Sequence, residues 1–227
     1  MGVLSEYAKK LLTVERIDFY ALDLPHRQEL KSPRMRLKVD FGFATEADIV
    51  ALTDDVRLDA FGRGNFFRRK MQLGHRLLLG RTGGDIVFYL WVVTGRKILL
   101  DKILLLDPGE IAIERAFSRP DVRGHGLYIC SLDYLLPRET ASGFIRCLTE
   151  IARNNRPMVV TARKYGFARL DSGYYQICHP FRQHALVRGL PRTRIVRNDS
   201  GLKAWEQEPS RLTRYLNRIR RPFGPSP

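Results

Sequence analysis

The chain has little cysteine and no long hydrophobic run. Its three cysteines are too few and too widely spaced for a disulfide framework or a Cys-x-x-Cys metal site. The longest apolar stretch, 98–106, is broken by Asp101 and Lys102 and is far shorter than the about 20 residues that span a bilayer. These absences exclude a disulfide-rich scaffold, a cysteine-based metal centre and a transmembrane helix.

A secretory signal is also missing from the first ten residues. Glu6, Lys9 and Lys10 interrupt the few apolar residues there, whereas a signal peptide needs a continuous apolar core. We therefore expect a cytosolic protein.

Acidic residues are in deficit. The chain has 39 lysines and arginines against 24 acidic residues, a formal charge of +15. Residues 179–227 alone hold eleven basic and three acidic residues, which is 11 − 3 = +8. The positive electrostatic potential of such a chain attracts nucleotide cofactors, phosphorylated substrates, nucleic acid or acidic lipid headgroups, and charge alone does not distinguish among them.

Apolar patterning predicts strands and helices in alternation. Residues 35–43 alternate as a half-buried strand does, and a helix is expected to begin near Thr45. After a second helical segment around 61–73, two apolar runs flank Gly83-Gly84, which is a hairpin signal. Residues 98–106 are expected to form a further strand, which completes an antiparallel meander.

The pattern in the second half of the chain predicts a strand–helix–strand crossover. A strand over 110–117 precedes a glycine-containing turn, and a helix with apolar residues at helical spacing is expected to stop at Pro137. The later elements are a strand over 144–151, a helix that follows Asn154-Asn155 and ends at Gly166, and late strands over 174–178 and 193–196.

The turn between the strand and the helix has the sequence Arg123-Gly124-His125-Gly126. A helix N-terminus leaves backbone N–H groups unpaired and carries partial positive charge, so it suits a phosphate. The two glycines allow close approach to the backbone, and Arg119 and Arg123 add charge. The turn lacks the third glycine of the dinucleotide pattern and the Lys-Ser/Thr of a P-loop.

In the order of the strands and helices around this glycine turn, the chain resembles the GNAT superfamily of acyl-CoA N-acyltransferases over about residues 35–180. In that family a strand, a Gln/Arg-x-x-Gly-x-Gly/Ala turn and a helix grip the coenzyme A pyrophosphate. A further strand then leads to an Asn, another helix and a closing Gly-Phe. This chain supplies residues 110–117, the turn 123–126, the strand 144–151, Asn155 and Gly166-Phe167.

The resemblance implies a mixed α/β (α+β) fold, a mostly antiparallel meander with a central parallel crossover and splayed strands. The expected organisation is an N-terminal extension over 1–34 with a short helix and a strand, an acyltransferase domain over 35–197, and a basic C-terminal helix and tail over 198–227. The extension is expected either to cover a sheet edge or to shape the acceptor site.

The resemblance also implies acetyl-CoA, or another acyl-CoA, as co-substrate, and no metal. The expected cofactor-binding residues are Phe117, Ser118, Arg119, Val122, Arg123, Gly124, His125, Gly126, Leu127 and Asn155. Two positions depart from the family pattern. Asp121 stands where Gln or Arg is preferred, and Ala162 stands where many relatives have the Tyr that protonates the leaving thiolate, so that role is unassigned.

The candidate general bases are Glu110 and Glu114, which share one face of the strand over 110–117. Desolvation raises a carboxylate's pKa toward a value useful for accepting an amine proton. The alternative is a structural ion pair with an arginine such as Arg115 or Arg146. His125 is expected to face solvent or a cofactor phosphate rather than to act as the base.

The function expected first is transfer of an acyl group, by default acetyl, to a primary amine on a small and possibly anionic acceptor. One alternative is a GNAT-scaffold binding module that has lost its chemistry. Another is an acyltransferase that acts on a protein or tRNA amine. The basic C-terminal segment could contact nucleic acid or an acidic membrane, or dock on its own domain.

Overall fold

The structure is a computed structural model that describes residues 13–25, 37–54, 64–99, 101–179 and 182–197. Within these ranges eight strands form the main sheet, in the order β10-β9-β1-β8-β7-β4-β3-β2. Their bounds are β1 (Thr13–Asp23), β2 (Asp40–Phe43), β3 (Arg76–Thr82), β4 (Asp85–Thr94), β7 (Glu110–Ser118), β8 (Arg146–Ala152), β9 (Ala168–His179) and β10 (Arg182–Arg188).

A second, smaller sheet and four α-helices complete the described fold. The small sheet has the order β11-β6-β5 and consists of β5 (Arg96–Leu99), β6 (Lys102–Leu105) and β11 (Ile195–Arg197). The helices are α2 (Glu46–Asp54), α3 (Gly64–Gln72), α4 (Leu127–Ala141) and α5 (Arg156–Tyr165).

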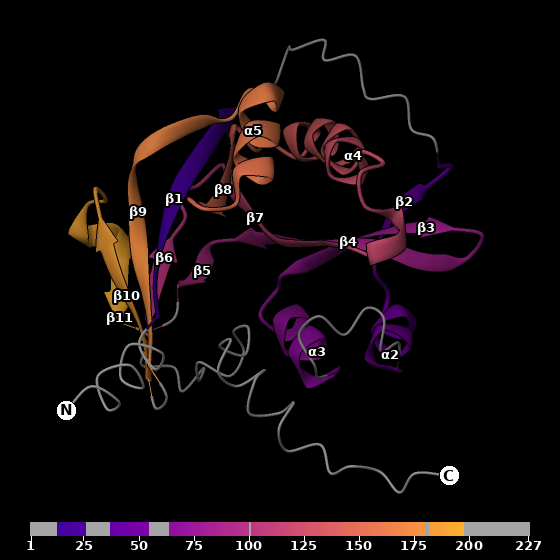
Figure 1. Cartoon of the computed structure of the whole chain (residues 1–227), viewed down its shortest axis with the longest axis horizontal. Helices are drawn as coiled ribbons and strands as arrows, with labels where there is room; N and C mark the ends of the chain where they lie inside the picture. Colours follow the sequence, from indigo (N-terminus) through magenta and orange to yellow (C-terminus); the bar gives the residue numbers. More distant parts are fainter. Residues whose placement is uncertain (1–12, 26–36, 55–63, 100, 180–181, 198–227) are drawn as a thin grey trace, which may run out of the picture.

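Helices lie on both sides of the main sheet. Figure 1 shows α4 and α5 on one side of it, and α2 and α3 with the small sheet on the other. Alternation along β7 fits this arrangement, because Ile111 and Ile113 join the apolar cluster beneath α4 and α5, while Ala112 joins a cluster on the opposite face. A third cluster around Trp91 lies between the sheet and the helices α2 and α3.

The predicted fold class is confirmed. β7 and β8 are parallel and are joined by α4, whereas the other paired strands are antiparallel. A parallel pair requires a crossover, and α4 provides it.

The N-terminal strand lies inside the main sheet. β1 pairs with β8 on one side, for example through Ile17 and Ala152, and with β9 on the other. Of the two alternatives left open for the N-terminal extension, the pairing rules out an edge-covering role for this strand, because β1 lies between β8 and β9. The domain boundary predicted at residue 34, the N-terminal helix and the basic C-terminal helix all lie outside the described residues.

Two local predictions are wrong, and one strand was missed. Residues 98–106 form two short strands, β5 and β6, because the polar Asp101 leaves the strand path and accepts a hydrogen bond from the Ala185 amide at 2.7 Å. Pro137 lies inside α4 rather than at its end. The last turn persists because the buried Glu139 is ion-paired with Arg76 at 2.6 Å. Strand β10 was not predicted at all.

None of the helices in the described ranges is both long enough and apolar enough to cross a membrane.

Candidate functional site

The two parallel strands separate halfway along their length. β7 and β8 pair from Glu110 opposite Arg146 to Ile113 opposite Thr149, and no later pair joins them within the described residues. Beyond that point β7 stays paired with β4, and β8 stays paired with β1. We call this opening the fork. Past it, alternate backbone groups of β7 face the gap instead of a neighbouring strand.

A backbone irregularity marks the fork on β7. Arg115 has a φ of 51°, in the left-handed region, and the register between β4 and β7 shifts between Tyr89 and Trp91 beside it. A non-glycine residue in this conformation costs about 1–2 kcal/mol. Such a strained bulge redirects the backbone groups that follow it.

The glycine turn connects the end of β7 with the start of α4. Gly124 and Gly126 have φ values of 82° and 77°, which glycine adopts without strain. Gly126 is the N-cap of α4 and no side chain caps the helix, so its first N–H groups keep their capacity to bind an anion. A Cβ on Gly124 would meet no atom within 4 Å, so the turn is open at this point.

The charged side chains around the turn have different orientations. Arg123 donates from Nε to the Ser118 carbonyl oxygen at 3.1 Å, which holds the exposed guanidinium beside the turn. Arg119 is engaged by Asp121 at 2.8 Å and Asp85 at 3.4 Å. Asp121 is thus turned toward Arg119, and Arg123 is better placed than Arg119 to contact a phosphate.

The remaining predicted cofactor residues divide into buried and surface positions. His125 lies with Nδ1 3.0 Å from the Val122 carbonyl oxygen, within its own loop. Val122 and Leu127 are buried in the cluster beneath α4 and α5. Asn155 caps α5 by accepting a hydrogen bond from the Met158 amide at 3.4 Å.

Phe117 and Ser118 end the strand that borders the fork. The Phe117 ring stacks on Tyr89, with 5.2 Å between ring centroids, and the Arg123 guanidinium carbon lies 5.8 Å from the Phe117 ring centroid. These contacts fix the end of β7 against its neighbour β4.

Glu110 lies at the beginning of β7, four residues before Glu114 and about 13 Å from it along the strand. Its buried carboxylate accepts a hydrogen bond from the Asp107 amide at 3.0 Å and is ion-paired with Arg194. Arg146 lies 3.9 Å away. Glu110 therefore lies far from the fork and is held in an ion pair, which favours the structural role and argues against Glu110 as the base.

Glu114 lies at the fork, on the face away from α4. It is buried and ion-paired with both Lys70 of α3 and Lys97 of β5. Lys97 also lies 3.2 Å from Glu150, the first residue of β8 beyond the last β7–β8 pair. The Tyr174 hydroxyl donates to Glu150 at 3.1 Å. Lys97 therefore bridges the two strands at the point where their backbone pairing stops.

Burial governs the titration of the groups around this network. Desolvation lowers the pKa of Lys97, and the Glu150 carboxylate opposes that shift. Desolvation also lowers the pKa of His75 to about 3, and the Lys70 and Lys97 ammonium groups act in the same direction. His75 is thus a neutral buried residue at physiological pH.

Tyr128 was not predicted as a site residue, although it directly follows the first residue of α4. Its hydroxyl is buried, lies beside Thr149 at the fork, and has no well-aligned hydrogen bond within the described ranges. Desolvation raises its pKa, so it stays protonated at neutral pH. The signal in the sequence is its position, two residues after the glycine turn.

Tyr165, three residues after Ala162, is engaged elsewhere. Tyr165 donates a hydrogen bond to Asp133 at 2.8 Å, and desolvation and Asp133 both raise its pKa. Ala162 is buried in the cluster beneath α5. Of these two tyrosines, it is therefore Tyr128 whose hydroxyl lies beside the fork.

The residues present fit a phosphate-bearing, extended co-substrate such as acyl-CoA. The uncapped start of α4, the open surface over Gly124 and the nearby Arg123 suit a pyrophosphate. The unpaired edge of β7 beyond the fork offers backbone hydrogen bonds to a chain that enters there.

The fold has known counterparts among solved structures. A tandem GNAT protein from the clavulanic acid biosynthesis pathway matches with a TM-score of 0.52 and 15% identity, over 78% of this chain and 58% of that one. A GNAT-family acetyltransferase from Colwellia psychrerythraea matches with a TM-score of 0.52 and 11% identity, over 74% of this chain and 57% of that one. The chain thus spans less than two thirds of either protein.

A third counterpart, a functionally unknown conserved protein from Staphylococcus epidermidis ATCC 12228, matches with a TM-score of 0.50 and 13% identity, over 79% of this chain and 67% of that one. No protein-family model matches the sequence, and no curated protein matches it either. The chain has the fold of the GNAT superfamily of acyl-CoA N-acyltransferases. At these identities the likeness defines the fold and not the activity.

Proposed function

We propose that the chain is an acyl-CoA-dependent N-acyltransferase that moves an acyl group, by default acetyl, to a primary amine of a small-molecule acceptor. The observation that carries this proposal is the adjacency of two features: an uncapped, glycine-lined helix start and a fork between two parallel strands. The first suits a pyrophosphate. The second exposes backbone N–H groups that can polarise an acyl carbonyl.

The reaction is direct attack of the neutral amine on the thioester carbonyl in a ternary complex. A carbon–nitrogen bond forms, the carbon–sulfur bond breaks, the amine loses a proton and the thiolate gains one. Backbone groups of β7 beyond Glu114 orient the carbonyl. The Tyr128 hydroxyl, buried at the fork, donates the proton to the leaving thiolate.

Glu114 is the better of the two candidate bases. Its carboxylate lies at the fork, whereas that of Glu110 is held by Arg194 at the other end of β7. The Lys97–Glu150 contact gives the accepted proton a route outward, because 22% of the Glu150 side chain is exposed.

The pair of glutamates provides a matched test of the base. We expect Glu114→Gln to lower turnover by about 10²-fold or more with little change in acyl-CoA binding. Glu110→Gln, an identical change on the same strand face, serves as the control and should leave turnover within a few-fold. A larger loss of turnover in Glu110→Gln would contradict this assignment.

The decisive experiment on the function measures binding and chemistry separately. Acetyl-CoA should raise the melting temperature, and a panel of primary amines should include one that accelerates thiol release from acetyl-CoA. The proposal would be refuted if acetyl-CoA did not raise the melting temperature and no amine accelerated thiol release.

A second candidate function is acyl-CoA binding without turnover. It is favoured by the two lysines that already pair with Glu114, since their ammonium groups occupy the carboxylate that would accept a proton. Stabilisation by acetyl-CoA together with no thiol release, for small amines and for protein or tRNA amines alike, would select it.

A further inference from the structure

Among the described elements, α5 covers only part of its side of strands β10, β9 and β1, and no other helix lies over the rest, which we call the open face (Figure 1). Leu186 pairs with Tyr175, and Tyr175 pairs with Arg16, so the three side chains form one row on one face. Leu186 is 60% exposed, Val14 near the start of β1 is 58% exposed, and Tyr175 is half-buried. Large apolar side chains thus face solvent on this part of the sheet.

The opposite face of the same strands is covered. Ile17, Tyr174 and Val187 alternate with the exposed residues and belong to the apolar cluster shared with the small sheet. The core residues of these strands therefore lie on the opposite face, and the open face is not part of that core.

Three arginines gather at one end of the open face around a single carboxylate. Asp18 is buried and lies 3.0 Å from Arg16, 2.6 Å from Arg188 and 3.9 Å from Arg169. Arg188 reaches Asp18 across Gly173, which lies between them in the strand order and has no side chain to block the path. One negative charge offsets only one of three guanidiniums, so the cluster keeps an excess of two positive charges.

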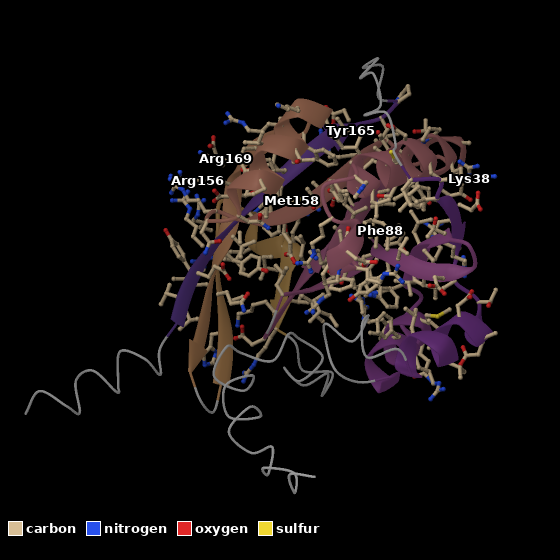
Figure 2. All side chains as sticks on the ribbon, turned by 45° about the vertical axis from the view of Figure 1, so that its right-hand side comes forward. Lys38, Phe88, Arg156, Met158, Tyr165 and Arg169 are labelled. Carbon is tan, nitrogen blue, oxygen red and sulfur yellow. The ribbon has the colours of Figure 1, made fainter. Side chains whose placement is uncertain are left out.

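The arginine cluster is both preorganised and reachable. Burial opposes ionisation of Asp18, but hydrogen bonds from Arg16 and Arg188 outweigh it and lower the pKa of the carboxyl, which keeps it as a fixed anchor. The Arg169 side chain is 45% exposed. Figure 2 shows Arg169 and Arg156, at the start of α5, on the same side of the molecule. These arginines thus have guanidinium surface left for an anionic partner.

We propose that this face binds single-stranded nucleic acid, with phosphates on the arginine cluster and a base stacked on Tyr175. Guanidinium groups match phosphate oxygens in a planar, two-pronged geometry, which lysine does not offer. A sheet surface that combines basic side chains with an aromatic ring is a common support for unpaired bases. The +15 charge of the chain favours the encounter. This surface lies on β10, β9 and β1, whereas the fork lies between β7 and β8, and its function does not depend on acyl transfer.

The test measures binding of a fluorescently labelled single-stranded RNA 12-mer of mixed sequence to the full chain as salt is varied. We expect Arg169→Gln to weaken binding and to reduce the slope of log affinity against log salt by about 0.7, the value for one lost phosphate contact on a single strand. Arg138→Gln is the matched control. It removes the same charge from an exposed arginine on α4, where the side chain lies over Tyr134, and should leave the slope unchanged.

Tyr175 tests the stacking half of the proposal. Tyr175→Leu keeps an apolar side chain but loses the ring, and should weaken RNA binding by about 5-fold or more. Tyr175→Phe keeps the ring and should bind within about 2-fold of the parent. Circular dichroism melting of each variant reports whether it is folded.

The proposal would be overturned by the absence of RNA binding at low salt or by equal slopes for Arg169→Gln and Arg138→Gln. It would also be overturned by equal affinity of Tyr175→Leu and Tyr175→Phe, or by a preference for the duplex of the same sequence. Tighter binding to vesicles that contain phosphatidylserine than to RNA would assign the face to an acidic lipid surface instead, and would also overturn it.

Discussion

At the scale of single residues, Tyr128 is the side chain whose chemistry depends most on its surroundings. Its hydroxyl is buried at the fork beside Thr149, and desolvation keeps it protonated. We expect Tyr128→Phe to lower turnover by about 10²-fold while the KM for acyl-CoA stays nearly constant, because the proton is needed only as the thiolate leaves. Thiol-release kinetics with acetyl-CoA measure both quantities.

Tyr165→Phe is the control for that experiment. It removes a hydroxyl of the same kind from α5, where the partner is Asp133 at 2.8 Å. It should lower the free energy of unfolding by about 1 kcal/mol and leave turnover unchanged. Equal turnover in the two variants would exclude Tyr128 as the proton donor.

His75 makes the stability of the protein depend on pH. Its pKa is about 3 in the folded protein, against about 6.5 when the chain is unfolded, because burial disfavours the imidazolium. The unfolded state therefore binds the extra proton first as the pH falls below 6.5, and stability is lost progressively from there down to about pH 3.

The size of this effect can be measured by urea unfolding at about pH 7.5 and about pH 5. His75 should contribute a loss of about 2 kcal/mol across that interval. His75→Gln should remove this part of the pH dependence, because an amide does not titrate. A variant with the same pH dependence as the parent would show that folding does not lower the pKa of His75.

At the scale of elements, the glycine turn determines how β7 passes into α4. Gly124 has a φ of 82°, and a Cβ there would meet no neighbouring atom, so backbone conformation alone opposes a side chain. Gly124→Val should cost about 1–2 kcal/mol of stability and weaken acetyl-CoA binding about 10-fold, because the turn shifts away from the phosphate-binding geometry. Calorimetric titration with acetyl-CoA and thermal unfolding measure the two effects.

Gly124→Asn is the matched variant at the same position. Asparagine tolerates the left-handed region far better than valine, so both losses should be smaller. If the two variants weaken binding equally, bulk rather than backbone conformation limits the turn.

At the scale of the whole molecule, strand β1 makes the N-terminal part integral to the sheet. Phe19 is 2% exposed, packs beside Tyr174 with ring centroids 5.9 Å apart, and belongs to the cluster between the two sheets. Phe19→Ala should lower the free energy of unfolding by about 3–5 kcal/mol in a single cooperative transition. Guanidinium denaturation followed by fluorescence and circular dichroism tests this.

Val14→Ala provides the contrast on the same strand. Val14 faces solvent on the open surface, so the variant should change stability by no more than about 0.5 kcal/mol. A separate early transition in Phe19→Ala would mean that β1 unfolds independently of the sheet.

The sequence predicted the elements whose signals are local. Gly83-Gly84 indicated the β3–β4 hairpin, Asn155 and Gly166 bounded α5, and the strand–turn–helix order around Gly124 indicated the parallel crossover. Each of these depends on the conformational preference of a few neighbouring residues. The split of residues 98–106 was missed because the Asp101 contact with Ala185 joins segments far apart in the chain.

The sequence by itself determined the mixed α/β fold class, the glycine turn and the chemical types available near it, because periodicity and glycine conformations are local properties. Only the tertiary structure decided which glutamate lies at the fork, that Lys97 bridges Glu114 and Glu150, and that β1 runs between β8 and β9. Strand order, burial and ion pairing arise from packing between distant segments, and no spacing along the chain encodes them.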